Sequence, residues 1–580
     1  MDMKRISRRQ PSPSPRGADP EDDDVGSRGT DRRPRLLRPV RRAVVLAAAF
    51  LIFAPALLVA SLAFRDRAPA WIRSESGGRG RLVGAEDGGG SGGGADEGMQ
   101  DSTNLHEDKL LGGLLSADFD EGTCLSRYHS SLNRKPSSHT PSSHLITRLR
   151  SYENLHRKCG PGTESYNKAV DQLKSGQNVG TSDCNYVAWI SYSGLGNRML
   201  SISSAFLYAL LTNRVLLIDR GTDMIDLFCE PFTAEKSWFL PLDFPLNQIN
   251  KFDVKSPESY GLMLKTNTIN YTIDNASSLP PFIYLHLNHD YGDNDKLFFC
   301  DQDQLLLQKV PWLVLRSDNY FVPSLFLMDS FEEELSRLFP EKDTVFHHLG
   351  RYLFHPTNKV WGLITRYYKA YLANAEERIG IQIRVFDTRP GPFQYILDQI
   401  LACSTKENLL PQVSNQEPIS TTTNKTSKAV LMTSLSAGYF EKIRDMYWEN
   451  PTHSGETISV YQPSHEGYQQ TEKQNHNMKA LAEIYLLSLT DVLITSSWST
   501  FGYVAQGLGG LKPWILYKPE NEVAPDPPCR QAVSMEPCFH APPFYDCKAK
   551  RGTDTGALVP HIVHCEDMSW GLKVVNRDEW

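Results

Sequence analysis

Short apolar runs bounded by polar residues recur along most of the chain. The clearest of them are residues 186–192, 214–218, 310–318, 380–386, 429–433 and 491–495. Each is rich in β-branched or aromatic residues and too short for a buried helix, which predicts strands buried on both faces. Helical patterns at residues 199–211 and 437–447 each follow one of these runs. Strands that alternate with helices predict an α/β fold with parallel sheets.

Two other stretches show the spacing of amphipathic helices. Residues 142–158 place Leu145, Leu149 and Leu155 on one side as candidate core positions, and residues 361–377 form a longer pattern of the same kind. We place a boundary between two lobes near the second helix. Residues 251–303 are polar and irregular, and the Ser- and Thr-rich residues 412–428 are expected to form a surface loop.

The first 105 residues differ in composition from the rest of the chain. Residues 1–42 carry twelve Lys or Arg against seven Asp or Glu, and the twenty-two residues 43–64 are uncharged and mostly apolar. That length can cross a bilayer of roughly 30 Å as a helix, and the basic flank should stay in the cytoplasm. Residues 65–105 are rich in Gly and charge, which predicts a flexible stalk. We therefore expect a type II membrane protein with an uncleaved signal anchor.

Charge, cysteines and glycosylation sequons narrow the class of protein. The formal net charge is -7 and its basic part lies in the N-terminal tail, which argues against a nucleic-acid partner. All ten cysteines follow the predicted anchor, four of them in the last fifty or so residues, and their spacing favours disulfides over a zinc site. The acceptor sequons, which are predicted glycosylation sites, are at Asn270, Asn275 and Asn424.

An anion-binding site is predicted where two of the apolar runs end. Arg384 follows the apolar run that begins at residue 380, and residues 496–502 (SSWSTFG) follow the run at 491–495. Parallel sheets bind ligands beyond the carboxyl ends of their strands, and a helix that starts near Thr500 would present backbone amides. Arginine can hydrogen-bond two phosphate oxygens, so we interpret this site as one for a nucleotide-sugar diphosphate. The ordinary alternatives are a salt bridge from Arg384 to Asp387 and simple helix capping.

A glycine turn at the end of the first apolar run offers a second ligand element. Gly194 and Gly196, followed by Asn197 and Arg198, lie between that run and the helical pattern at 199–211. A dinucleotide-binding unit would show a similar arrangement, but the third glycine of its fingerprint is replaced by Met199. The ordinary alternative is a tight turn that closes a βαβ unit.

Two acidic triplets raise the question of a metal. Residues 293–295 (Asp-Asn-Asp) and 301–303 (Asp-Gln-Asp) have the Asp-x-Asp form that can hold a divalent cation against a diphosphate. Neither triplet follows an obvious buried strand, and such triplets are common in acidic loops. A metal-dependent transferase therefore stays an alternative, and we predict no metal and no cofactor.

The chain resembles the plant cell-wall fucosyltransferases, the family of the xyloglucan galactoside 2-alpha-L-fucosyltransferases, over about residues 110–580. The motifs that carry this resemblance are SGLGNRM at 193–199, GIQIRVF at 380–386, SSWSTFGYVAQGLGG at 496–510, SMEPCFHAPPFYDCKAK at 534–550 and HCEDMSWGLK at 564–573. The resemblance implies a two-lobed GT-B-type fold with Rossmann-like lobes, GDP-fucose as donor, inversion at the anomeric carbon, no required metal and residence in the Golgi membrane. It leaves open a homodimer.

The resemblance also implies roles for residues of this chain. Those expected to bind the donor are Gln382, Arg384, Ser496, Ser499, Thr500, Phe501 and Gly502. The loop from Gly194 to Arg198 is expected to lie in the cleft and to face the diphosphate from the first lobe. Gln382 lies where related fucosyltransferases often have His, so no histidine role is transferred to it. Candidate general bases are Asp318, at the end of a first-lobe strand, and Asp567, in the tail motif, and Arg384 is expected to stabilise the leaving group. For either aspartate an N-cap or a structural salt bridge is the alternative.

The predicted organisation divides the chain into six parts. They are a cytoplasmic tail (1–42), an anchor (43–64), a stalk (65–105), an acceptor-side lobe (106–368), a GDP-fucose lobe (369–525) and a Cys- and Pro-rich tail that packs on the lobes (526–580). The expected acceptor is a galactose on a cell-wall glycan, with xyloglucan first and an arabinogalactan protein or a pectic side chain as alternatives. A membrane-anchored glycan-binding protein without turnover is the alternative from another class.

Overall fold

The computed structural model describes residues 109–576, apart from 181–182, 222–223, 234, 247, 274, 388, 390 and 415–425. All of these residues belong to one compact unit, Met99–Trp580. The predicted tail, anchor and stalk lie outside the described residues, as does the sequon at Asn424. Within the described part of the chain, no helix has the length and apolar character needed to span a membrane.

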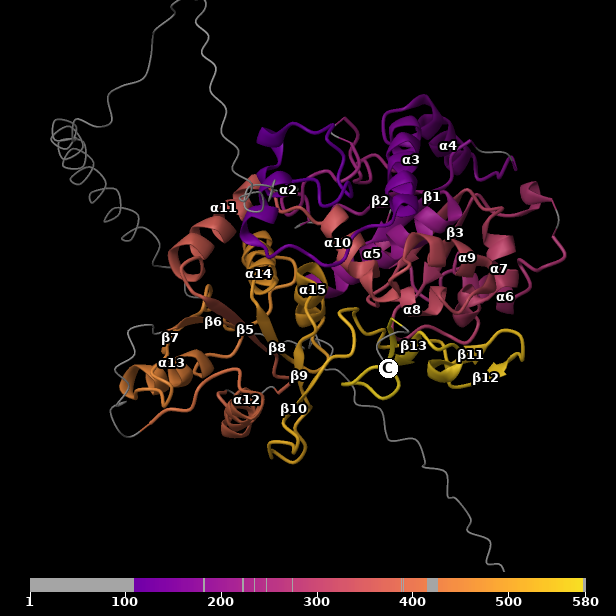
Figure 1. Ribbon diagram of the computed structural model, residues 1–580. Coiled ribbons are helices and arrows are strands. Elements are labelled where there is room, and N and C mark those ends of the chain that lie inside the picture. The colour runs from indigo at the N-terminus through magenta and orange to yellow at the C-terminus, as the bar shows by residue number, and fades with distance from the viewer. Residues whose placement is uncertain are drawn as a thin grey trace, which may run out of the picture. The chain divides into compact units, whose positions relative to one another are not determined.

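The apolar runs form two separate sheets (Figure 1). The first contains four parallel strands in the order β2-β1-β4-β3. The second contains six strands in the order β10-β9-β8-β5-β6-β7, which are parallel except for the edge strand β10. The strands are β1 (Tyr186–Ile190), β2 (Val215–Ile218), β3 (Phe282–His286), β4 (Trp312–Arg316), β5 (Glu377–Ile383), β6 (Ser427–Ser434), β7 (Thr457–Tyr461), β8 (Val492–Ser496), β9 (Trp514–Leu516), β10 (Cys529–Gln531), β11 (Tyr545–Asp546), β12 (Arg551–Gly552), β13 (Ile562–His564) and β14 (Leu572–Val574).

Helices connect the strands and cover both sheets. They are α2 (Leu125–His129), α3 (Ser143–Cys159), α4 (Glu164–Ser175), α5 (Leu195–Thr212), α6 (Tyr260–Lys265), α7 (Asp301–Leu307), α8 (Val322–Leu325), α9 (Asp329–Leu338), α10 (Val345–Leu353), α11 (Asn358–Tyr367), α12 (Gln394–Lys406), α13 (Tyr439–Glu449), α14 (Gln474–Leu487) and α15 (Thr500–Gly509). The α/β fold with parallel sheets is therefore confirmed.

Both faces of the central strands are buried, which explains why these strands are continuously apolar. Val187 and Trp189 of β1 belong to a large core that includes α5, α10, α14 and α15 and extends to β6 and β8 of the second sheet. Tyr186 and Ala188 pack on the opposite face, under α4. Ile381 of β5 likewise packs against α12. The helices α5, α10 and α15 thus lie between the two sheets (Figure 1).

Two predictions from the sequence pattern need correction. The helix predicted at 361–377 is α11, which begins earlier and continues as a π-helical turn, Tyr368–Leu372, while Glu377 already belongs to β5. The segment 251–303, predicted to be irregular, contains α6 and the strand β3. The five-residue strand β3 is a short apolar run among polar loops, and its pairing with β4 is what shows it to be a strand.

All ten cysteines are paired, so the predicted disulfides are confirmed. The pairs are Cys124–Cys229, Cys159–Cys184, Cys300–Cys547, Cys403–Cys529 and Cys538–Cys565. Of the four cysteines near the C-terminus, only Cys538 and Cys565 bond to each other. The other two tie the C-terminal segment to α12 and to the chain just before α7.

Candidate active site

The two predicted anion-binding segments lie side by side at one edge of the second sheet. Gln382 of β5 is paired with Thr495 of β8, so Arg384 and Ser496 emerge next to each other. The Arg384 backbone N–H donates to Ser496 Oγ at 3.0 Å. These groups therefore meet at the carboxyl ends of neighbouring parallel strands, where such sheets bind ligands.

The Arg384 guanidinium is not committed to a carboxylate. Its Nη2 donates to Gln469 Oε1 at 3.4 Å, and its Cζ lies 5.1 Å from the centre of the Phe386 ring. The alternative salt bridge is not formed, because Asp387 pairs with Arg389 at 2.6 Å. Among the described residues, no acidic side chain lies within ion-pair distance of Arg384. Burial lowers the pKa of Arg384, but a guanidinium stays protonated, so the site holds an uncompensated positive charge.

Helix α15 begins at Thr500, as the sequence predicts, shortly after β8 ends at Ser496. Ser499 caps the helix by accepting a hydrogen bond from the Gly502 N–H at 3.4 Å. A Cβ at Gly502 would lie 2.0 Å from Thr495 Oγ1, so only glycine lets the helix approach β8 this closely. Thr495 Oγ1 in turn donates to the buried Gln382 Oε1 at 2.8 Å. Through Thr495, Gln382 therefore stabilises the contact between β8 and the start of α15. The neighbouring Phe501 packs partly against the core.

The first turn of α5 meets the first turn of α15. Thr500 Oγ1 donates to Asn197 Oδ1 at 2.8 Å, and Asn197 Nδ2 donates to the Asp318 carbonyl at 3.1 Å. A Cβ at Gly196 would lie 2.7 Å from Thr500 Oγ1, which shows how closely the two helices approach. The amino ends of two helices carry positive partial charge, so their meeting beside Arg384 favours an anion.

The segment 194–198 is therefore not the loop that was predicted. Gly194 is the N-cap of α5, and Asn197 and Arg198 lie in the first helical turn. The side chains of Leu195 and Met199 are buried in the core. The helix therefore begins at Leu195, about one turn before residue 199, where the sequence pattern predicted its start. Arg198 is buried and its Nε donates to the Ser193 carbonyl at 2.8 Å, so it stabilises the backbone just before α5.

Asp318 lies just beyond β4 and holds a histidine that the sequence did not single out. Its Oδ2 is 2.6 Å from His289 Nδ1, and its Oδ1 accepts from the His289 backbone N–H at 3.0 Å. The Asp318 side chain is 8% exposed, whereas the His289 side chain is 58% exposed. A buried carboxylate thus orients an accessible imidazole, which is the arrangement of a general base with its positioning group. Only the pairing of β3 with β4 brings the two residues together.

The other predicted base, Asp567, is engaged with the segment before α15. Its Oδ2 accepts from the Trp498 backbone N–H at 2.9 Å and from the Tyr503 hydroxyl at 2.6 Å. Its backbone carbonyl accepts from Trp498 Nε1 at 2.6 Å. Burial and the Asp567 charge raise the pKa of Tyr503 far above its usual range. Asp567 therefore lies near the predicted site, and it positions Trp498.

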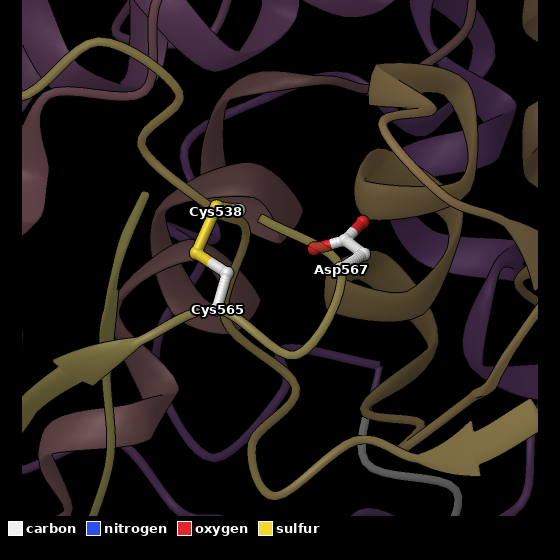
Figure 2. Close-up of side chains that lie close together, drawn as sticks. All are labelled: Cys538, Cys565 and Asp567. Carbon is white, nitrogen blue, oxygen red and sulfur yellow. A yellow bond between two sulfur atoms is a disulfide. The ribbon is translucent and has the colours of Figure 1, made fainter. Parts of the chain in front are cut away.

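Asp567 also lies beside two cysteines, as Figure 2 shows. The ligand atoms of Cys538, Cys565 and Asp567 lie within 4.8 Å of one another, which is the spacing of a metal site. The two sulfurs are bonded to each other, however, and a disulfide sulfur is not the thiolate that binds zinc. We therefore assign this group to the disulfide and not to a metal.

The acidic triplets make contacts within the protein. Asp295 accepts from the Gly261 and Gly292 N–H groups at 3.1 and 2.9 Å. Asp303 accepts from the hydroxyl of Tyr271 at 3.0 Å, and burial raises its pKa to about 6. These carboxylates hold the loops around α6 and α7 together. Asp295 and Asp303 thus have partners within the protein.

The two sequons in the described part of the chain lie on polar loops. Asn275 is exposed, and its Oδ1 accepts from the Ser277 N–H at 3.1 Å. Asn270 is half-buried, and its Oδ1 accepts from the Thr272 N–H at 3.0 Å. Glycosylation at these residues stays a prediction.

The comparisons with known proteins agree with this geometry. The family model described as xyloglucan fucosyltransferase matches residues 90–548. The chain belongs to the xyloglucan fucosyltransferase family. A galactoside 2-alpha-L-fucosyltransferase of Pisum sativum is 67% identical over 479 residues, which cover 82% of this chain and 84% of that protein. The protein of that name from Arabidopsis thaliana is 64% identical over 475 residues, with coverage of 82% and 84%.

A solved structure from the same family is similar to this one. A mutant of Arabidopsis thaliana FUT1 in complex with GDP matches with a TM-score of 0.76 and 62% sequence identity, over 81% of this chain and all of that one. The similarity of this chain to a known fucosyltransferase thus includes the three-dimensional fold as well as the sequence.

Proposed function

We propose that this protein transfers L-fucose from GDP-fucose to the 2-hydroxyl of a galactose on a plant cell-wall polysaccharide, with xyloglucan as the acceptor. Family membership and two relatives named galactoside 2-alpha-L-fucosyltransferase support the reaction. The observation that carries the donor is the guanidinium of Arg384, which is not ion-paired within the described chain and lies beside the starts of α5 and α15. FUT1, whose structure resembles this one, was solved with GDP.

The two sheets would then serve as the lobes of a GT-B-type enzyme. In this proposal residues 106–368 form the acceptor-side lobe, residues 369–525 form the GDP-fucose lobe, and residues 526–580 pack on both. The division is supported by the separate strand orders of the two sheets and by the close contact of α5 with α15. It would assign Arg384 to the GDP-fucose lobe and Asp318 to the acceptor-side lobe.

The reaction needs charge stabilisation and the removal of one proton. The bond from fucose C1 to the β-phosphate oxygen breaks, and its electron pair leaves with GDP. Arg384 and the amides at the start of α15 would stabilise that charge as it grows, which accelerates the step more than ground-state binding does. The acceptor oxygen forms the new bond to C1 from the opposite face, with inversion, and releases its proton.

The pair of Asp318 and His289 is our choice for the group that takes this proton. The exposed imidazole can reach an acceptor hydroxyl, and the buried carboxylate would stabilise the imidazolium that forms. Asp567 fits the role less well, because its Oδ2 already accepts two hydrogen bonds. This assignment makes Asp318 a positioning residue and gives the catalytic contact to His289.

The positive charge of Arg384 and the helix amides can do the work that a metal does in other transferases, so we propose a metal-independent enzyme without a cofactor. We also propose that it is a type II protein of the Golgi membrane. The five disulfides support an oxidising compartment for the described part of the chain. The homodimer stays a prediction.

Transfer of labelled fucose tests the proposal. The purified protein is incubated with GDP-fucose and a panel of fucose-free xyloglucan, arabinogalactan glycans and pectic side chains, with and without a chelator. We expect an α-1,2-linked fucosyl galactose on xyloglucan, and unchanged turnover with the chelator. Transfer to another acceptor would reassign the substrate. A protein that binds these glycans but neither transfers nor hydrolyses GDP-fucose would be a non-catalytic relative.

A further inference from the structure

Three aromatic side chains form a row beside Arg384, and the reaction chemistry above gives them no role. We call Phe386, Trp498 and Trp570 the aromatic strip. The ring centres of Phe386 and Trp498 are 6.5 Å apart, and those of Trp498 and Trp570 are 5.9 Å apart. Phe386 is 61% exposed and Trp570 is 48% exposed. Large apolar side chains that remain exposed together commonly mark a binding surface.

The central ring of the aromatic strip is held in an unfavourable backbone conformation. Trp498 has φ = 61°, which is rare for a bulky residue and costs energy unless the surroundings impose it. Asp567 imposes it by accepting hydrogen bonds from both the backbone N–H and the indole N–H of Trp498. The Lys518 Nζ lies 4.2 Å from the centre of the indole ring and packs on it. Strain that is maintained at a ligand cleft indicates that the position of the ring matters.

The C-terminal segment supplies the third ring. Trp570 lies in the turn between β13 and β14, next to Gly571, where a Cβ would come within 2.5 Å of the sulfur of Cys538. The bond from Cys538 to Cys565 therefore holds this turn tightly against the protein. The C-terminal segment thus contributes Trp570 to the edge of the candidate active site.

We propose that the aromatic strip binds the backbone of the acceptor polysaccharide. The faces of pyranose rings carry apolar C–H groups, which pack well on aromatic faces, whereas their edges carry hydroxyls that hydrogen-bond to water and polar side chains. Several rings in series suit a chain of sugars better than a single flat base. Phe386, at one end of the strip, lies against Arg384, so a bound chain would run up to the reaction centre. This inference rests on the proposed function, since it presumes a polysaccharide acceptor.

Substitution of the end rings tests the proposal. We expect Phe386→Ala and Trp570→Ala each to raise the KM for fucose-free xyloglucan polymer about tenfold, as loss of an aromatic binding anchor does. Trp570 is at the end of the strip away from Arg384, so for Trp570→Ala the KM for methyl β-galactoside, a single sugar, and the KM for GDP-fucose should change by less than about twofold. Trp570→Tyr keeps a ring and should recover most of the affinity for the polymer. Thermal melting of each variant checks that it is folded.

Trp448→Ala is the matched control. Trp448 is 86% exposed on α13 and makes no ring contact with the aromatic strip in the described structure. Its substitution should leave the KM for the polymer unchanged. An unchanged KM for the polymer in both strip variants would overturn the proposal, as would an equal rise with methyl β-galactoside in Trp570→Ala. A selective rise in the KM for GDP-fucose would also overturn it, because the rings would then serve the nucleotide.

Affinity electrophoresis in gels that contain xyloglucan separates this inference from the proposed function, because it measures binding without turnover. Slower migration of the wild-type protein, lost in Trp570→Ala and kept in Trp448→Ala, would support the aromatic strip even if no fucose were transferred. Normal transfer with equal retardation of all variants would uphold the function and refute the strip.

Discussion

Arg384 offers the sharpest test of the site, because its removal disturbs little of the folded structure. Its side chain makes one hydrogen bond of 3.4 Å to the exposed Gln469 and one contact with the exposed Phe386 ring. The loss of these contacts should lower the free energy of unfolding by about 0.5 to 1 kcal/mol. If the guanidinium stabilises the leaving diphosphate, Arg384→Ala should lower kcat by about 100- to 1,000-fold, which is about 2.7 to 4 kcal/mol of transition-state stabilisation.

A second arginine on the same strand is a matched control. Arg378 lies near the other end of β5 and forms a two-point ion pair with Asp491, with N···O distances of 3.0 and 3.1 Å. Lys135 also contacts Asp491 at 2.6 Å, so this carboxylate would keep one partner. Arg378→Ala should therefore lower the free energy of unfolding by about 1 to 3 kcal/mol and leave kcat near the wild-type value.

The assay measures kcat, GDP binding and thermal melting on the same preparations of wild type, Arg384→Ala, Arg384→Lys and Arg378→Ala. Arg384→Lys should recover only part of the activity, because an ammonium keeps the charge but loses the planar fork. A folded Arg384→Ala enzyme with kcat within about threefold of wild type would refute the reasoning. An equal loss of kcat in Arg378→Ala would show that the effect reflects the strand and not the site.

Three further predictions concern helix contact, a disulfide and pH. Gly196→Ala places a Cβ 2.7 Å from Thr500 Oγ1, so it should separate α5 from α15 and weaken GDP binding about tenfold in calorimetry; unchanged affinity would contradict this. The double variant Cys538→Ser and Cys565→Ser should lose about 2 to 4 kcal/mol of stability in denaturant unfolding, and an unchanged midpoint would contradict the structural role of this bond. Burial raises the pKa of Glu536 from its usual 4.5 to about 8, so its contribution to stability is present at low pH and is lost as the pH rises through about 8. Glu536→Gln should flatten the fall in unfolding free energy between pH 5 and about 8.5, and a variant that keeps the wild-type slope would exclude this group as its cause.

The amino-acid sequence predicted well those features that depend on neighbours along the chain. The apolar runs that became β1, β5 and β8 could be recognised because a strand buried on both faces needs an apolar side chain at nearly every position. A start of α15 near Thr500 was predicted from residues 496–502, and Ser499 is its N-cap in the structure. Because the ends of parallel strands meet at one sheet edge, the approach of Arg384 to Ser496 was also predictable.

Other features depend on which distant segments pack together. The first turn of α5 was misjudged as a loop, since its glycines suggest a turn, while burial of Leu195 and Met199 in the core and contact with α15 hold it as a helix. His289 gave no local signal, and only the pairing of β3 with β4 places it on Asp318.

The sequence alone thus determined the class of fold, the positions of the central strands along the chain and the presence of a cation at a strand end, because each is written in a few consecutive residues. The tertiary structure alone decided the pairing of Asp318 with His289 and the partner of each cysteine. It also decided that Asp567 holds Trp498 from 69 residues away. Contacts over such distances are selected by the packing of the whole core, and no pattern within a single segment records them.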